Sequence, residues 1–135
     1  MKNVVLRITR HPLTEDREVS LRSVYGKDVR VVTEDIPYGS DPIAAVRALV
    51  ERAEVDGGKV VAVEAVGPEH VLLQLVEGLA DDGIIVIRQV YKRDPETGRV
   101  IVTGKDERGR DILAFDCYEA VKVEVRKTLV GRTLT

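Results

Sequence analysis

Residues 41–66 read DPIAAVRALVERAEVDGGKVVAVEAV, and this stretch decides the predicted fold. An aspartate followed by a proline is typical of a helix start, because the carboxylate accepts from free backbone N–H groups and proline fits the first turn. Apolar residues then recur along one helical face, at Ile43, Val46, Val50 and Ala53. The mostly apolar segment 60–66 that follows predicts a strand.

The same alternation of strand and helix extends to both sides of this stretch. The expected strands are residues 4–9, 29–33, 60–66 and 84–91, and the expected helices are residues 14–25, 42–53 and 68–80. Strands that alternate with helices form a parallel sheet with right-handed crossovers. The sequence therefore predicts an α/β fold, a three-layer Rossmann-like domain with a mainly parallel sheet.

A β-rich extension follows the strand that ends at Tyr91. Its turn residues and apolar runs predict a hairpin and further antiparallel strands. The expected parts are a turn at 92–98, a strand at 99–103, a turn at 104–110, and strands at 112–118 and 121–125. We expect a single domain over residues 1–135, with its core in residues 1–91 and a β-hairpin extension in residues 92–135.

Charge and composition restrict the partners of the chain. Its 135 residues carry 21 basic and 23 acidic side chains, a net charge of −2, so an anion has to be held by a local arrangement and duplex DNA is disfavoured. The apolar run near Met1 is too short for a signal peptide or a membrane span, which predicts a cytoplasmic protein without a membrane partner. The share of charged residues, 33%, with more Arg than Lys, is typical of a thermophile.

Several cofactor and metal motifs are absent from the sequence. It has no G-x-G-x-x-G after the first expected strand, no G-x-x-x-x-G-K-[ST] and no G-x-S-x-G, which disfavours dinucleotide enzymes, P-loop proteins and the common α/β hydrolases. Two histidines and one cysteine do not make a metal cluster, so we expect neither a metal nor a cofactor. The one cysteine, Cys117, is expected to be a small buried hydrophobe in a reducing cytoplasm.

The loop after the first expected strand contains the strongest candidates for a functional site. Ligands of open parallel α/β sheets bind at the carboxyl ends of the strands. Arg10 offers a planar guanidinium for a phosphate, His11 can exchange a proton near neutral pH, and Thr14 stands where it would cap a helix whose N-terminus favours anions. Arg10 and His11 are therefore the candidate catalytic residues. The same residues also fit a structural explanation, with Arg10 solvated, His11 packed and Thr14 a helix cap only.

Other loops at the same edge add candidate ligand-binding residues. Tyr38 can stack on a base, and Gly39 and Ser40 allow close backbone approach, although the three also fit an ordinary turn. The candidate ligand-binding residues are Thr9, Thr14, Tyr38, Gly39, Ser40, Gly67 and Arg88. His70, one turn into a helix, is expected to be a surface residue.

Arg7 and Arg30 stand inside strands that are otherwise apolar. A buried guanidinium needs an anionic partner. We expect each of the two to be exposed at a sheet edge or paired with a carboxylate such as Glu64.

The segment Arg10-His11-Pro12-Leu13-Thr14-Glu15 resembles the His-x-Leu-Thr motif found at the same place in small single-domain CRISPR-associated Rossmann-fold (CARF-like) proteins of type III CRISPR loci. The resemblance covers this motif and the strand-helix order of residues 1–91. The family often has Ser or Asn where this chain has Arg10, and a Gln further into the helix where it has Arg17 or Glu18.

The resemblance implies a role in antiviral defence: binding of a cyclic oligoadenylate second messenger across a homodimer, with or without slow cleavage of the ring. A ring of phosphates and unstacked adenines suits a two-fold site that pairs Arg10 about the axis. In a metal-independent ring nuclease, a ribose 2′-hydroxyl attacks the neighbouring phosphate, with Arg10 on the phosphate and His11 as acid or base. Two other functions stay open: a sensor or sequestering protein for the same ligand, and a structural or interaction protein on a Rossmann-like scaffold.

Overall fold

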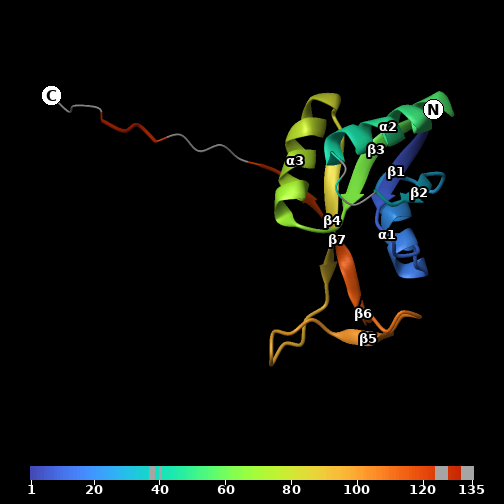
Figure 1. The fold of residues 1–135 in the computed structure, drawn as a ribbon. Coiled ribbons are helices and arrows are strands. Elements are labelled where there is room, and N and C mark those ends of the chain that lie inside the picture. The colour runs from blue at the N-terminus through green and yellow to red at the C-terminus, as the bar shows by residue number, and fades with distance from the viewer. Residues whose placement is uncertain (37–38, 40, 124–127, 132–135) are drawn as a thin grey trace.

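The computed structural model describes residues 1–36, 39, 41–123 and 128–131. Strands and helices alternate through the first part of the chain, and strands and turns follow (Figure 1). The elements in chain order are β1 (Lys2–Ile8), α1 (Glu15–Tyr25), β2 (Arg30–Glu34), α2 (Pro42–Val55), β3 (Gly58–Ala65), α3 (Glu69–Leu79), the short 3-10 helix η1 (Ala80–Asp82), β4 (Ile85–Tyr91), β5 (Val102–Lys105), β6 (Asp111–Leu113) and β7 (Phe115–Val121). No helix in the described part of the chain is long and apolar enough to cross a membrane.

Five strands form one mainly parallel sheet, in the order β2-β1-β3-β4-β7. β1 pairs in parallel with β2 and with β3, and β3 pairs in parallel with β4. β7, from the extension, pairs antiparallel with β4 and forms one edge of the sheet. The structure confirms the predicted α/β fold with a mainly parallel sheet and an antiparallel addition, and the four core strands lie close to their predicted positions.

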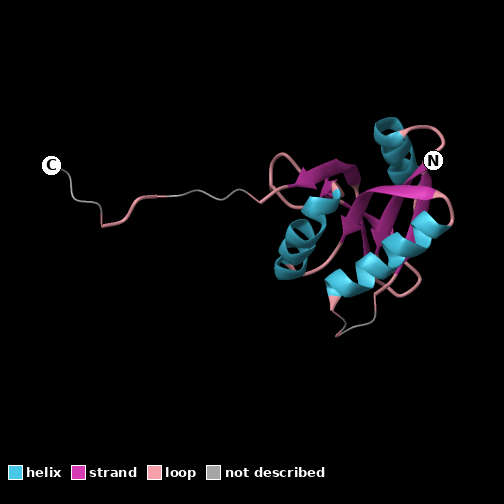
Figure 2. Ribbon diagram, turned by 90° about the horizontal axis from the view of Figure 1, so that it is seen from above, coloured by secondary structure: helices cyan, strands magenta, loops and turns pink. Residues whose placement is uncertain are grey.

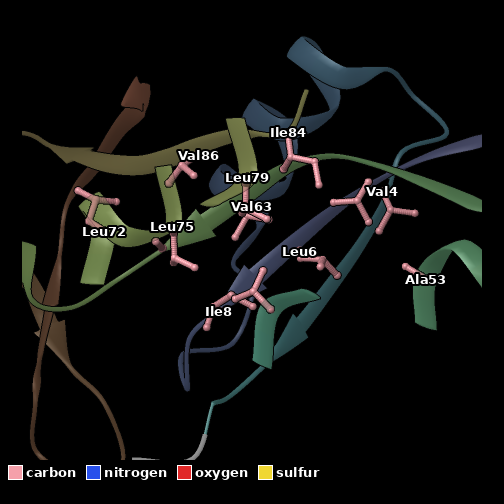
Figure 3. Close-up of a cluster of buried hydrophobic side chains, with 13 residues drawn as sticks. Val4, Leu6, Ile8, Ala53, Val63, Leu72, Leu75, Leu79, Ile84 and Val86 are labelled. Carbon is pink, nitrogen blue, oxygen red and sulfur yellow. The ribbon is translucent and has the colours of Figure 1, made fainter. Parts of the chain in front are cut away.

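Both faces of the sheet carry buried apolar side chains. Val4, Leu6 and Ile8 of β1 belong to a hydrophobic cluster with residues of α2 and α3 (Figure 3). Val5 belongs to a second cluster, with Leu21 of α1. Because successive side chains of a strand point to opposite faces, α1 packs on one face of β1 and the other two helices on the other. Figure 2 accordingly shows helices on both sides of the sheet.

An irregularity in β3 decides which face of the sheet carries Glu64. The pairing of β1 with β3 shifts by one residue after Val60, so that Val61 is an extra residue, a β-bulge. Strict alternation from Val60 would place Glu64 on the face covered by α2 and α3. The bulge turns Glu64 to the α1 face instead, beside Arg7, its pairing partner on β1.

The start of α2 follows the sequence prediction. Asp41 Oδ1 accepts hydrogen bonds from the N–H groups of Ile43 (3.0 Å) and Ala44 (3.3 Å), and Pro42 occupies the first helical turn. The cap fixes where the chain leaves the β2–α2 loop and enters the helix.

Replacing Asp41 by alanine is expected to lower the free energy of unfolding by about 1 kcal/mol, because two backbone donors lose their acceptor. Asp41→Asn keeps an acceptor oxygen and is expected to remain within a few tenths of a kcal/mol of the parent. Urea denaturation of the two variants and the parent measures the difference. An equal loss in both variants would show that the charge of Asp41, and not its capping bond, stabilises the helix.

The strands of the extension begin and end at other residues than predicted. The strand expected at 99–103 is replaced by an isolated bridge between Arg93 and Val100 and by β5, which pairs antiparallel with β6. The strand expected at 112–118 is divided at Ala114. That residue accepts from Lys92 N–H and donates to the Ile101 carbonyl, so the chain leaves one ladder there and enters another.

The end of the extension also differs. The separate strand expected at 121–125 does not form in the described residues, because β7 continues to Val121 and residues 122–123 are not in a strand; residues 124–125 lie outside the described part. The β5–β6 hairpin projects beyond the ends of β4 and β7 (Figure 1). The prediction for Cys117 was wrong, because this cysteine is exposed on β7, which among the described strands pairs in the sheet with β4 alone.

Candidate functional site

A cavity of about 600 Å³ lies at the carboxyl ends of β1 and β3, where parallel α/β sheets bind their ligands. We name it the histidine cavity, because its walls include His11 from the β1–α1 loop and His70 from the first turn of α3. Its apolar lining includes Ile8, Ala65 and Leu75. The other polar lining residues in the described part of the chain are Thr9, Arg10, Asp35, Gln74 and Arg110. The volume falls in the range of small-molecule sites, roughly 300–1,000 Å³.

Arg10 forms an ion pair at the rim of the histidine cavity. Its Nε donates to Oδ2 of Asp35, in the β2–α2 loop, at 2.9 Å. The two side chains are 59% and 49% exposed, so water screens the pair, and such pairs contribute less than about 1 kcal/mol. A guanidinium carries donors on all three nitrogens, and within the described residues only Nε of Arg10 is engaged. Its two terminal nitrogens are therefore available to an anion.

The main chain of His11 is held on both sides. Its N–H donates to Oγ1 of Thr9 at 3.1 Å, and its carbonyl accepts from Nη1 of Arg7 at 3.3 Å. Thr9 is itself buried, and its N–H donates to the carbonyl of Glu34 at 3.0 Å. The loop that carries Arg10 and His11 is thus attached to both β1 and β2. The structure brings the predicted residues Thr9, Arg10 and His11 together.

The sequence predicts that His70 lies on the surface but not that it lines the same cavity as His11. It is exposed, as expected, but it lines the histidine cavity. A signal was present, since His70 follows Gly67 and Pro68 at the carboxyl end of the third strand, one of the loops that the strand-end rule selects. Both histidines of the chain therefore line one cavity.

Thr14 occupies the N-cap position of α1 but does not cap the helix with its side chain. Its hydroxyl donates to Asp16 and accepts from Nη1 of Arg17. The hydrogen bond from Thr14 holds the pKa of the Asp16 carboxyl below its usual value. Thr14 is therefore at the predicted N-cap position, but its hydroxyl forms no hydrogen bond to the helix N-terminus. The hydroxyl hydrogen-bonds to the Asp16 carboxylate instead. Thr14 is not among the residues that line the histidine cavity.

Two predicted residues, Gly67 and Arg88, line a different cavity of about 500 Å³ between α3, β4 and β7. Arg88 pairs there with Glu119 of β7, and both side chains are about half exposed. The loop between β3 and α3 separates the two cavities, and Pro68 borders both. Arg88 and Arg10 therefore line different cavities. In the sheet, β3 lies between β1, which precedes Arg10, and β4, which carries Arg88.

The second loop is described in part. Gly39 lines the histidine cavity with a backbone φ of +84°, a conformation that favours glycine. Tyr38 and Ser40 lie outside the described residues, so their predicted roles in ligand binding stay predictions.

A second group of polar residues lies on the α1 face of the sheet, and sequence reasoning found only part of it. We name it the polar cluster; its members are Arg7, Arg17, Glu64, Gln89 and Tyr118. Glu64 Oε1 accepts from Arg7 Nε at 3.0 Å and from the Tyr118 hydroxyl at 2.6 Å, and its Oε2 accepts from Gln89 Nε2 at 2.8 Å. Arg17 of α1 donates through Nε to Gln89 Oε1 at 2.9 Å and lies over the Phe115 ring.

The expected pairing of Arg7 with Glu64 is confirmed, and both side chains are fully buried. Burial, followed by the hydrogen bond to Glu64, raises the pKa of the Tyr118 hydroxyl well above its usual value. The phenol therefore stays protonated and donates to the carboxylate. For Arg30, whose Nε is buried, no hydrogen-bond partner of that atom occurs among the described residues.

Comparison of the chain with protein-family models, with curated proteins and with solved structures finds no match. No group of three or more His, Cys, Asp or Glu side chains placed to hold a metal ion occurs in the described part of the chain. Any functional assignment therefore rests on the residues of the histidine cavity and on the sequence motif that supplies two of them.

Proposed function

We propose that the chain binds a cyclic oligoadenylate in the histidine cavity of a CARF-like, three-layer Rossmann-like domain, and that it cleaves the ring. The observation that carries the proposal is that Arg10, His11 and His70 line one cavity at the carboxyl ends of β1 and β3. The His-x-Leu-Thr resemblance names the ligand class, and the cavity supplies groups that suit it.

The lining of the cavity matches the two chemical parts of a nucleotide. Arg10 offers donors for phosphate oxygens at the rim. Ile36, Val66 and Val71, which are partly or well exposed, give an apolar surface against which an adenine can pack. α3 and the first residue of α2 border this surface.

The two histidines suit cleavage by the ligand's own ribose. Attack of a 2′-hydroxyl on the adjacent phosphorus forms a 2′,3′-cyclic phosphate and breaks the bond to the 5′-oxygen. A base takes the proton of the 2′-hydroxyl, and an acid gives a proton to the departing 5′-oxygen. His11 and His70, from different elements around one cavity, can fill these two roles, while Arg10 stabilises the charge on phosphorus.

A ring of several nucleotides needs more surface than one such cavity offers. Two copies that face each other about a two-fold axis double the number of guanidinium and imidazole groups and match the symmetry of the ring. We therefore propose a homodimer as the binding unit. Light scattering at micromolar concentration measures its mass, and a monomer that stays monomeric with ligand would exclude the two-fold site.

The proposal is tested by titrating the protein with cyclic tri-, tetra- and hexa-adenylate and with the linear oligomers of the same length. Calorimetry measures binding, and chromatography with mass analysis identifies the products. Binding with a product that ends in a 2′,3′-cyclic phosphate supports the ring nuclease. Binding without products identifies a sensor or sequestering protein, and binding of none of the probes favours a structural or interaction protein.

Arg10→Ala is expected to weaken binding of the cyclic ligand by about 1.5–3 kcal/mol, roughly ten-fold to more than a hundred-fold, because a charge-assisted contact to phosphate is lost. Asp35→Ala removes the carboxylate that pairs with Arg10 and leaves the guanidinium in place, so it is expected not to weaken binding. Calorimetric titration of both variants separates the two effects. Equal losses in both would mean that the ion pair, and not Arg10 itself, maintains the site.

A further inference from the structure

Arg7 connects the interior of the sheet with the loop that carries the candidate site. It is fully buried near the carboxyl end of β1, with Nε on Glu64 Oε1 at 3.0 Å. Its Nη1 donates to the carbonyl of His11 at 3.3 Å and to Oγ1 of Thr33, on β2, at 3.1 Å. One guanidinium thus joins β1, β2, β3 and the β1–α1 loop.

Stability alone does not account for this arrangement. Burial of two charges costs desolvation energy, and replacement of such a pair by uncharged residues of similar volume is often neutral or stabilising. Nη2 of Arg7, also buried, has no hydrogen-bond partner among the described residues. An unsatisfied buried donor adds a further cost. The ion pair is therefore a poor way to stabilise this face of the sheet, where Val5, Leu21 and Ile87 already belong to an apolar cluster.

The ion pair of Arg7 with Glu64 affects the geometry of the main chain at His11. The carbonyl of His11 is held by Arg7 and its N–H by Thr9, so both hydrogen-bonding groups of its main chain are fixed. The direction of the imidazole then depends only on side-chain rotation. Displacement of a catalytic group by about 1 Å can lower a rate by a factor of about 10².

We propose that Arg7 is a positioning residue: held by Glu64, its guanidinium fixes the main chain of His11 and so directs the imidazole into the histidine cavity. What the imidazole then acts on rests on the proposed function. Glu64 in turn is held by Tyr118 of β7 and Gln89 of β4. The extension therefore contributes to the position of His11 through the carboxylate that it helps to hold.

The test uses the full chain with the double substitution Arg7→Met and Glu64→Gln. Methionine keeps an unbranched apolar side chain without the guanidinium, and glutamine keeps an acceptor for Tyr118, so neither leaves an unpaired buried charge. The chain has two histidines, so its imidazole NMR spectrum contains two sets of ring signals, and His70 serves as the internal control on α3. We expect the His11 resonances to shift or broaden while those of His70 stay unchanged.

A second readout follows the reaction. In the double variant, kcat for cleavage of cyclic tetra-adenylate is expected to fall about ten-fold or more with a smaller change in KM, because the ligand still finds Arg10. Unchanged His11 resonances and unchanged kcat would overturn the proposal and make Arg7 a purely structural residue. If the parent cleaves no oligoadenylate, the proposed function fails, and the comparison of His11 with His70 still decides the role of Arg7.

Arg7→Lys covers the case in which the double variant does not fold. Lysine keeps a positive charge for Glu64 but lacks the planar fork that reaches two acceptors in different directions. We expect the same selective change at His11, and restoration of the parent spectrum would be evidence against positioning by the guanidinium.

Discussion

Replacement of Glu64 by alanine is expected to lower the free energy of unfolding by about 3–5 kcal/mol, the usual loss when one partner of a buried ion pair is removed. The carboxylate accepts from Arg7, Gln89 and Tyr118, and each of these donors would lose its acceptor in the interior. Arg7 would keep its charge, because arginine is not deprotonated in proteins. Its side chain is 0% exposed, so water would not replace the lost carboxylate. Urea denaturation followed by circular dichroism measures the change.

Glu119→Ala is the matched control for this prediction. Glu119 also pairs with an arginine, Arg88, across two neighbouring strands, but both side chains are about half exposed. Its removal is expected to cost less than about 1 kcal/mol. Similar losses for the two variants would contradict the argument that burial, and not the ion pair as such, makes Glu64 indispensable.

The parallel core could be predicted from sequence because its signals are local. Asp41 before Pro42, the apolar stripe of α2 and the continuous apolar runs of the strands each fix one element without reference to the others. The bulge at Val61 carries no such signal, since a run of valines and alanine looks the same with one residue more or less. That extra residue places Glu64 beside Arg7. The sequence therefore suggests Glu64 as a partner for Arg7, but it does not reveal the bulge that brings the two together.

The strands of the extension were harder to predict because their boundaries depend on tertiary pairing. Residues 111–121 look like one or two strands from their pattern alone, and the division at Ala114 arises from backbone bonds to Lys92 and Ile101. The expectation that Cys117 is buried rests on its apolar neighbours in the sequence. An apolar neighbourhood in sequence does not tell which strand becomes the edge of a sheet.

The candidate site could be predicted in part, and the limits are again geometric. Thr9, Arg10, His11 and Gly39 were selected by the strand-end rule, and the structure places them around one cavity. Arg88 was selected by the same rule and lies at another cavity, since the rule gives the edge of the sheet and not the face or the strand order. For His70 the sequence predicts only a surface position, because a polar residue in the first turn of a helix is usually solvated.

His11→Ala is expected to lower the rate of ring cleavage by roughly 10² or more while the affinity for the ring stays within a few-fold. The main chain at this position is held by Arg7 and Thr9, and removal of the imidazole leaves those two bonds intact. The loop should therefore keep its shape, and Arg10 should still bind phosphate. Single-turnover kinetics measures the rate, and calorimetry measures the affinity.

His70→Ala is expected to lower the rate by a similar factor, because the reaction needs both a base and an acid. Single-turnover kinetics of the His70→Ala variant measures this loss. Gln74→Ala is the control, since Gln74 lines the same cavity one turn further along α3 but has no titratable group. Parent-like cleavage by His11→Ala would place the chemistry elsewhere and leave His11 as a packing residue. Loss of the fold in both histidine variants would remove the claim of the β1–α1 loop to be the site.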